Sequence, residues 1–91
     1  MKTIWKYSFP LGPLTRQIPR GGVVLSFAMQ FNIPCIWVLV DDGALMETRQ
    51  FRIVGTGQPL PDPDNSKFIG TVLADGGNFV WHLFEIVKQE G

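Results

Sequence analysis

The segment best suited to bind a ligand is Gly55-Thr56-Gly57, which follows an apolar run and precedes a loop rich in proline and aspartate. Glycine lets a backbone approach a ligand closely, and successive N–H groups can form a nest that binds anions. Arg52 and Gln58 flank the hinge, and the planar fork of arginine suits phosphate, carboxylate or a stacked base. The hinge lacks the lysine of a P-loop, the three spaced glycines of a dinucleotide fingerprint and a following helix. The Gly55-Thr56-Gly57 hinge is therefore most typical of the end of a strand. A loop that lines a ligand site is the alternative interpretation.

Three tryptophans fall in three expected strands and offer large flat surfaces. Trp37 lies in the most apolar strand, so we expect it in the core. Trp5 and Trp81 lie in strands nearer the chain ends, where an exposed ring would suit base stacking or a protein interface. The candidate ligand-binding residues are therefore Arg52, Gly55, Thr56, Gly57, Gln58, Trp5 and Trp81.

Catalytic chemistry has little support in the sequence. The single histidine, His82, lies in an alternating segment and shares a face with Val80 and Phe84, which is typical of a half-covered sheet surface. Ser26 or Thr56 could act as a nucleophile only if His82 and an aspartate converged on it, and the chain has no nucleophile-elbow motif. We expect no catalytic residue and no enzyme.

Metal and cofactor sites are not expected either. Asp62, Asp64 and Asp75 lie in segments rich in proline and glycine, where aspartate is common for turn geometry alone. Cys35 is the only cysteine, which excludes an internal disulfide and a cysteine cluster for zinc. We expect Cys35 to be a buried, small apolar residue in a strand.

The composition describes a small and nearly uncharged domain. The 91 residues suffice for one domain, residues 1–91, with 45% hydrophobic and 18% charged residues and a formal net charge of zero. Eight basic and eight acidic residues are scattered, whereas a protein that grips extended nucleic acid usually gathers a basic stripe. Surplus apolar surface and little repulsion between copies predict a homo-oligomer. No signal peptide or apolar membrane run is visible, so we expect a soluble, intracellular protein.

Alternation of apolar and polar residues predicts an all-β chain. The expected strands are residues 3–9, 23–31, 35–40, 46–54, 67–73 and 79–87, and residues 14–18 could add a short further strand. One face of the strand at 23–31 would carry Val23, Leu25, Phe27, Met29 and Phe31. The run at 35–40 is apolar on both faces and suits a central strand. The late residues of the last segment could form a short helical turn instead of continuing the strand.

Short turn signals separate these strands. Asn32-Ile33-Pro34 could connect a hairpin, and the Asp-Gly pair at 42–43 tolerates the positive φ of a tight turn. The long loop at 55–66 is the only one of its length, and long loops in compact domains are often functional. We predict six or seven strands in a small antiparallel sandwich or a partly open barrel.

Five segments together resemble a family of short proteins of unknown function that are encoded by phages and prophages. They are KTIWKY at 2–7, CIWVLVD at 35–41, ETRQFRIVGTG at 47–57, IGT at 69–71 and FVWHLFE at 79–85. The resemblance covers nearly the whole chain. Gln58 stands where the family has a histidine, which argues against catalysis at that position.

The resemblance implies an accessory phage protein that acts against host defence in the cytoplasm of the infected bacterium. In one mechanism an oligomer sequesters a nucleotide immune signal, without cleaving it, in pockets at its subunit boundaries. The hinge at 55–57 would then supply backbone donors, Arg52 the charge, and Trp5 or Trp81 a stacking face. In a second mechanism an aromatic patch or sheet edge docks onto a host protein, such as a CRISPR or other defence effector, and blocks it. A third reading is a structural or housekeeping protein of the phage.

Overall fold

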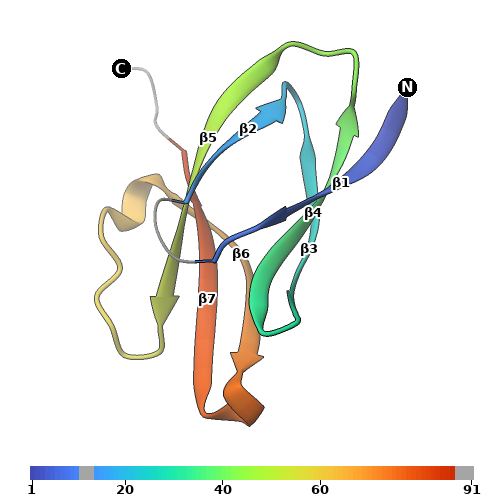
Figure 1. The fold of residues 1–91 in the computed structure, drawn as a ribbon. Coiled ribbons are helices and arrows are strands. Elements are labelled where there is room, and N and C mark those ends of the chain that lie inside the picture. Colours follow the sequence, from blue (N-terminus) through green and yellow to red (C-terminus); the bar gives the residue numbers. More distant parts are fainter. Residues whose placement is uncertain (11–13, 88–91) are drawn as a thin grey trace.

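The computed structural model describes residues 1–10 and 14–87, and its regular structure is almost entirely β (Figure 1). The elements in chain order are β1 (Lys2–Ser8), β2 (Thr15–Pro19), β3 (Val23–Gln30), β4 (Ile33–Asp41), β5 (Met46–Gly55), the 3₁₀ turn η1 (Pro63–Asn65), β6 (Ser66–Ala74), the 3₁₀ turn η2 (Asp75–Gly77) and β7 (Phe79–Ile86). All seven strands lie where alternation predicts them. The last strand stays extended to Ile86, without a helical turn.

The strands form two antiparallel sheets, ordered β1-β4-β3 and β2-β5-β7-β6, which face each other as a sandwich. The sheets do not close into a barrel, because no ladder joins them. Along the seam between β1 and β2, isolated side chains make the connection instead. The Tyr7 hydroxyl donates to the Gln17 carbonyl at 3.1 Å, and Arg16 Nη2 donates to the Ser8 carbonyl at 2.6 Å.

The core lies between the sheets. Strand β4 is central, as predicted, and its alternate residues Ile36, Val38 and Val40 are almost fully buried. The facing sheet contributes Phe51 and Leu83. The whole buried cluster is Phe9, Ile18, Ile36, Val38, Val40, Phe51 and Leu83.

The prediction that Trp37 belongs to this core is wrong. Successive residues of a strand point to opposite faces, so the burial of Ile36 and Val38 between the sheets turns Trp37 outward. Its ring is half-buried on the outer face, where its strand neighbours are Lys6 and Ser26. Cys35 is buried, as predicted, with 2% of its surface exposed.

A β-bulge in β3 corrects the predicted face of that strand. The pairing with β4 shifts between Val24 and Ser26, which inserts Leu25 as an extra residue. Val24 and Phe27 therefore pack against the core, whereas Val23 and Leu25 are 55% and 50% exposed. An alternating pattern cannot reveal where such a slip occurs.

The hairpin between β3 and β4 is tighter than predicted. Its turn consists of Phe31 and Asn32, with φ of 50° and 62°, and Ile33 already belongs to β4. Positive φ at both positions is the geometry of a type I′ turn. Pro34 has no N–H to donate, but this costs no ladder hydrogen bond. It lies just beyond Cys35, where the pairing of β4 with β1 ends, and its carbonyl accepts from the Phe9 N–H at 2.8 Å.

Candidate functional site

The Gly55-Thr56-Gly57 hinge ends strand β5, as predicted, and closes a tight turn on itself. The Gln58 N–H donates to the Gly55 carbonyl at 3.0 Å, and Gly57 has a φ of 85° that favours glycine. The Gln58 side-chain oxygen accepts from the Gly55 N–H at 2.9 Å. One of the backbone donors that an anion would need is thus already paired within the turn.

Thr56 is held by the single histidine. Its hydroxyl lies 2.7 Å from His82 Nε2, and the Thr71 hydroxyl lies 2.9 Å from His82 Nδ1. Which hydroxyl donates and which accepts depends on the tautomer of the imidazole. A hydrolytic triad places a carboxylate against Nδ1, and here that position is held by a threonine. The arrangement ties the turn to the outer face of the sheet, which is half-covered at His82 as predicted.

Arg52 also supports the long loop. Its Nη1 donates to the Pro61 carbonyl at 3.0 Å, while the Ser66 hydroxyl donates to the Asp62 carbonyl at 2.9 Å. Arg52 pairs with Phe84 in the β5–β7 ladder and shares the outer face of the sheet with His82. Arg52, Thr56 and His82 therefore lie in one region.

The two candidate tryptophans lie elsewhere. Trp5 is half-buried on the inner face of β1 and packs against the core. Trp81 pairs with Gly55 in the β5–β7 ladder but lies on the inner side of the sheet. The seven candidate residues thus fall in three places in one copy of the chain, and whether they bind a ligand stays a prediction.

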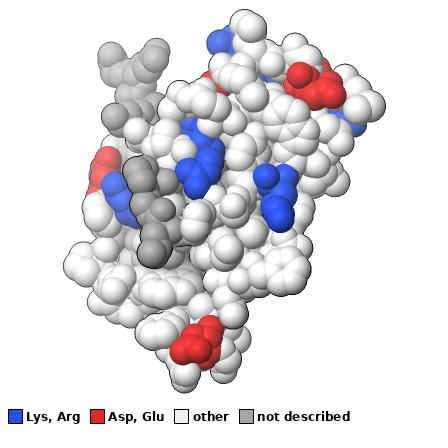
Figure 2. Space-filling view, in the orientation of Figure 1, with Lys and Arg blue, Asp and Glu red and all other residues white. Residues whose placement is uncertain are grey.

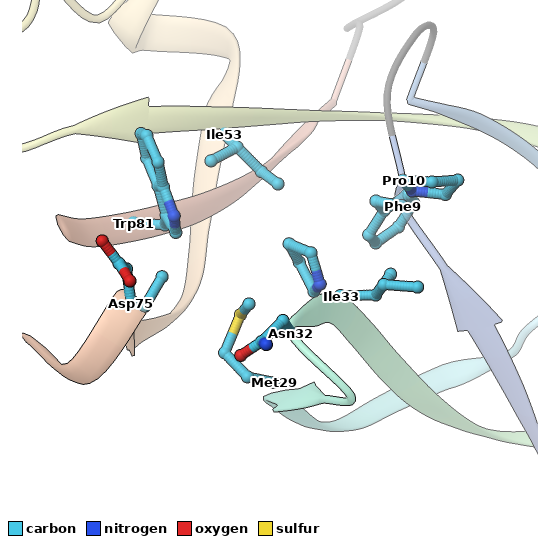
Figure 3. A pocket seen from close by; sticks show the side chains of 10 residues that line it. Phe9, Pro10, Met29, Asn32, Ile33, Ile53, Asp75 and Trp81 are labelled. Atoms are coloured by element: carbon cyan, nitrogen blue, oxygen red, sulfur yellow. The ribbon is translucent and has the colours of Figure 1, made fainter.

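A cleft of about 590 Å³ opens between the two sheets at the end that carries the β3–β4 turn and η2 (Figure 3). Trp81 and Ile53 come from the large sheet, and Met29, Asn32 and Ile33 from the hairpin of the small one. The full lining is Phe9, Pro10, Met29, Asn32, Ile33, Pro34, Ile53, Ala74, Asp75 and Trp81. The polar side chains in this set are those of Asn32 and Asp75, so the cleft is mainly apolar.

Aromatic rings form one margin of the cleft. Trp81 is half-buried, and its ring stacks on that of Phe79 with centroids 5.6 Å apart and planes 12° apart. Phe79 is 51% exposed. Asp75, beside Trp81, receives a hydrogen bond from the Asn78 amide at 3.3 Å. A flat or branched apolar group could enter here and meet one carboxylate at the edge.

A second cleft, of about 690 Å³, is polar, and the charged side chains Arg49 and Glu85 in its lining are paired with each other. Arg49 Nε and Nη2 donate to the Glu85 carboxylate at 2.6 and 2.7 Å, and Arg49 Nη1 donates to the Gly22 carbonyl at 2.5 Å. Hydrogen bonding to Glu85 is the main cause of the raised pKa of the Arg49 guanidinium. The guanidinium therefore connects strands β5 and β7 and the turn before β3, and its donors are used within the protein.

Of the residues that line the cleft, the sequence indicates only Trp81 as a candidate, and its role in binding stays a prediction. The lining of the cleft comes from five separate parts of the chain, and only the sheet topology brings them together. The residues around Asp75 favour a turn, and they give no sign that its carboxylate lies at the edge of a cleft. Phe31, an apolar residue next to the turn signal of Asn32, was the one local sign of an unusual hairpin.

The described part of the chain contains neither a metal-binding cluster nor a membrane-spanning helix. Residues 1–10 and 14–87 contain no group of three or more histidine, cysteine, aspartate or glutamate side chains that could hold a metal. The same residues form no helix long and apolar enough to cross a membrane.

The fold and the cleft define a small two-sheet β-sandwich with one apolar, open end. The family described as "Domain of unknown function (DUF7352)" matches residues 1–91, and the chain belongs to this family. No curated protein and no solved structure matches the chain.

Proposed function

We propose that this protein is a non-enzymatic binding protein that holds an apolar side chain of a protein partner in the cleft between its sheets. The observation that carries the proposal is the 590 Å³ apolar opening beside the half-buried ring of Trp81. Concave, mainly apolar sites with a few polar groups are the usual form of a binding site. A desolvated aromatic anchor is also the usual centre of a protein interface.

The charges around the cleft favour a particular partner chemistry. The lining contains no lysine or arginine, and its charged side chain is the carboxylate of Asp75. On the face seen in Figure 2, the end that carries η2 shows acidic side-chain atoms and no basic ones. This carboxylate would repel a phosphate and attract a cation. The best occupant is therefore a large apolar side chain next to a lysine or arginine.

The biological setting of the proposal comes from the resemblance to phage proteins. We propose that the protein is phage-encoded and docks onto a host defence protein in the cytoplasm of the infected bacterium. Sequestration of a nucleotide signal is the second candidate, and the observation that favours it is the position of Trp81, where a base could stack. In that case a neighbouring subunit would have to supply the positive charge for the phosphates.

An NMR titration with two sets of probes separates these functions. The first set is short peptides with a phenylalanine or tryptophan next to an arginine, and the same peptides with alanine for the aromatic residue or glutamate for the arginine. The second set is cyclic nucleotides and ADP-ribose. We expect the aromatic–arginine peptides to shift the backbone amides of Asn32, Asp75 and Trp81, and the other peptides to do so weakly.

A matched pair of variants tests the role of the carboxylate. Asp75→Asn should abolish the preference for arginine over glutamate in the peptide, whereas Asp64→Asn, in the exposed turn η1, should leave it unchanged. Shifts at the cleft with nucleotides alone would replace the proposal by nucleotide binding. No shift with either set of probes would refute a binding role for the cleft.

A further inference from the structure

The tip of the β3–β4 hairpin combines two features that are unfavourable in an isolated chain. The side chain of Phe31 is 90% exposed, and its φ of 50° lies in the left-handed region. A bulky residue rarely adopts this conformation, and type I′ turns strongly prefer asparagine, aspartate or glycine there. Such strain in a tight turn is a recurrent sign of a functional position.

The position of Phe31 relative to the cleft indicates a use for it. The next residues along the chain, Asn32 and Ile33, line the cleft, so Phe31 lies at its rim. A projecting ring and an apolar opening therefore occur on the same end of the molecule. Two copies placed end to end about a two-fold axis can make both contacts at once, because an isologous interface pairs the same patch with itself.

We propose that the Phe31 ring of one copy enters the cleft of a second copy, and that the second copy returns the same contact. The resulting dimer does not rest on the proposed function, because it requires no partner protein. The cleft of about 590 Å³ has ample room for one phenyl ring. Phe79 and Ile33, which are 51% and 37% exposed, lie close to this contact and would lose part of their exposure.

The net charge of the chain does not oppose this dimer, and the small area of the interface limits its affinity. The formal net charge of the chain is zero, and the charged side chain of the cleft is that of Asp75. Burying one phenylalanine ring and an equal area of cleft on each copy removes roughly 800 Å² in total, below the 1,200–2,000 Å² of a standard stable interface. The dimer should therefore be weak and should depend on protein concentration.

Sedimentation velocity on the full chain tests the dimer. We expect the wild-type protein to pass from monomer to dimer between about 1 μM and about 1 mM, the range in which weak interfaces titrate. Phe31→Asn removes the ring and suits the left-handed turn, so this variant should fold and remain monomeric throughout. Leu45→Asn is the matched control, because Leu45 is 75% exposed on the β4–β5 turn at the other end of the molecule. It should dimerise like the wild type.

Three results would overturn the proposal. The first is a wild-type protein that stays monomeric over the whole range, and the second is equal dimerisation of the wild type and Phe31→Asn. Isotope-filtered NMR on a mixed sample adds a positional test, since the Phe31 ring of one copy should show contacts to Trp81 or Met29 of the other. Loss of Leu45→Asn dimers alone would place the interface at the opposite end and would also reject it.

The same variant separates this inference from the proposed function. Phe31→Asn retains every residue that lines the cleft, so the aromatic–arginine peptides should bind it at least as well as the wild type. Peptide binding by a wild-type protein that never dimerises would leave the proposed function in place and reject the dimer. Dimerisation without peptide binding would reject the proposed function and leave the dimer in place.

Discussion

Tyr7 is a single residue that connects the two sheets, and the pKa of its phenol depends on that contact. Its hydroxyl donates to the Gln17 carbonyl across the seam between β1 and β2. Burial raises the pKa of the phenol, and the nearby positive charge of Arg49 only partly offsets this. The protein has a single tyrosine, so its titration can be followed without interference from others.

The shift in the pKa of Tyr7 predicts how stability depends on pH at the alkaline end. The pKa of Tyr7 in the folded protein lies above 10.0, the ordinary value for tyrosine, so the unfolded chain loses this proton first. The stabilisation is therefore fully present below pH 10.0 and is lost as the pH rises through the folded pKa. Tyrosinate absorbance should titrate later in native protein than in urea. Tyr7→Phe should remove the signal and flatten the alkaline loss of stability; identical native and denatured titrations would contradict this.

The ion pair between Arg49 and Glu85 is the strongest polar contact in the described chain on geometric grounds. The side chains of Arg49 and Glu85 are 15% and 14% exposed, and the contact is bidentate. Such a pair is less screened than a surface pair, and leaving the guanidinium poorly paired carries a desolvation cost.

Glu85→Gln should therefore lower the free energy of unfolding by about 1–3 kcal/mol. Urea denaturation monitored by tryptophan fluorescence measures the change. Asp64→Asn makes the same carboxylate-to-amide change on an exposed turn and should alter stability by less than about 0.5 kcal/mol. Equal effects of the two substitutions would show that the half-buried pair of Arg49 and Glu85 contributes nothing specific to stability.

At the scale of the elements, the strands could be predicted and their faces only partly. Alternation located all seven strands, because each needs one apolar side against the core. Trp37 was misplaced because its strand is apolar on both faces, so the pattern carries no sign of which face turns inward. The bulge at Leu25 was missed for a related reason. A one-residue insertion leaves both registers rich in apolar residues.

Two glycines in turns allow a specific prediction of how substitution changes stability. Gly57 has a φ of 85°, and a Cβ placed on it would meet no atom within 4 Å. Gly57→Ala should therefore cost only the backbone strain of a left-handed alanine, about 1–2 kcal/mol. Gly43→Ala is the control, because Gly43 lies outside the left-handed region and its added Cβ would make an ordinary contact of 3.6 Å with Asp41. Thermal unfolding should separate the two variants, and equal shifts in Tm would contradict the assigned turn.

At the scale of the whole molecule, the sequence predicts a small antiparallel sandwich or a partly open barrel, but it does not predict the cleft between the two sheets. The candidate residues around 52–58 are neighbours in sequence and lie on the outer face of one sheet, whereas the cleft lies between the sheets. Its lining residues, such as Phe9, Ile53 and Trp81, are far apart in the chain. Local motifs cannot indicate a site that exists only after the sheets have packed.

The absence of net charge and the apolar lining of the cleft together predict how the proposed dimer responds to its solution. Neither copy carries a formal net charge, and the Phe31 contact involves no ion pair. An increase of about tenfold in ionic strength should thus change the dimer dissociation constant by less than about twofold. Calorimetric dilution should also give a negative heat-capacity change on association, because the buried surface is apolar. A dissociation constant that rises steeply with salt would instead identify a charged interface, and Phe31 would then not be its centre.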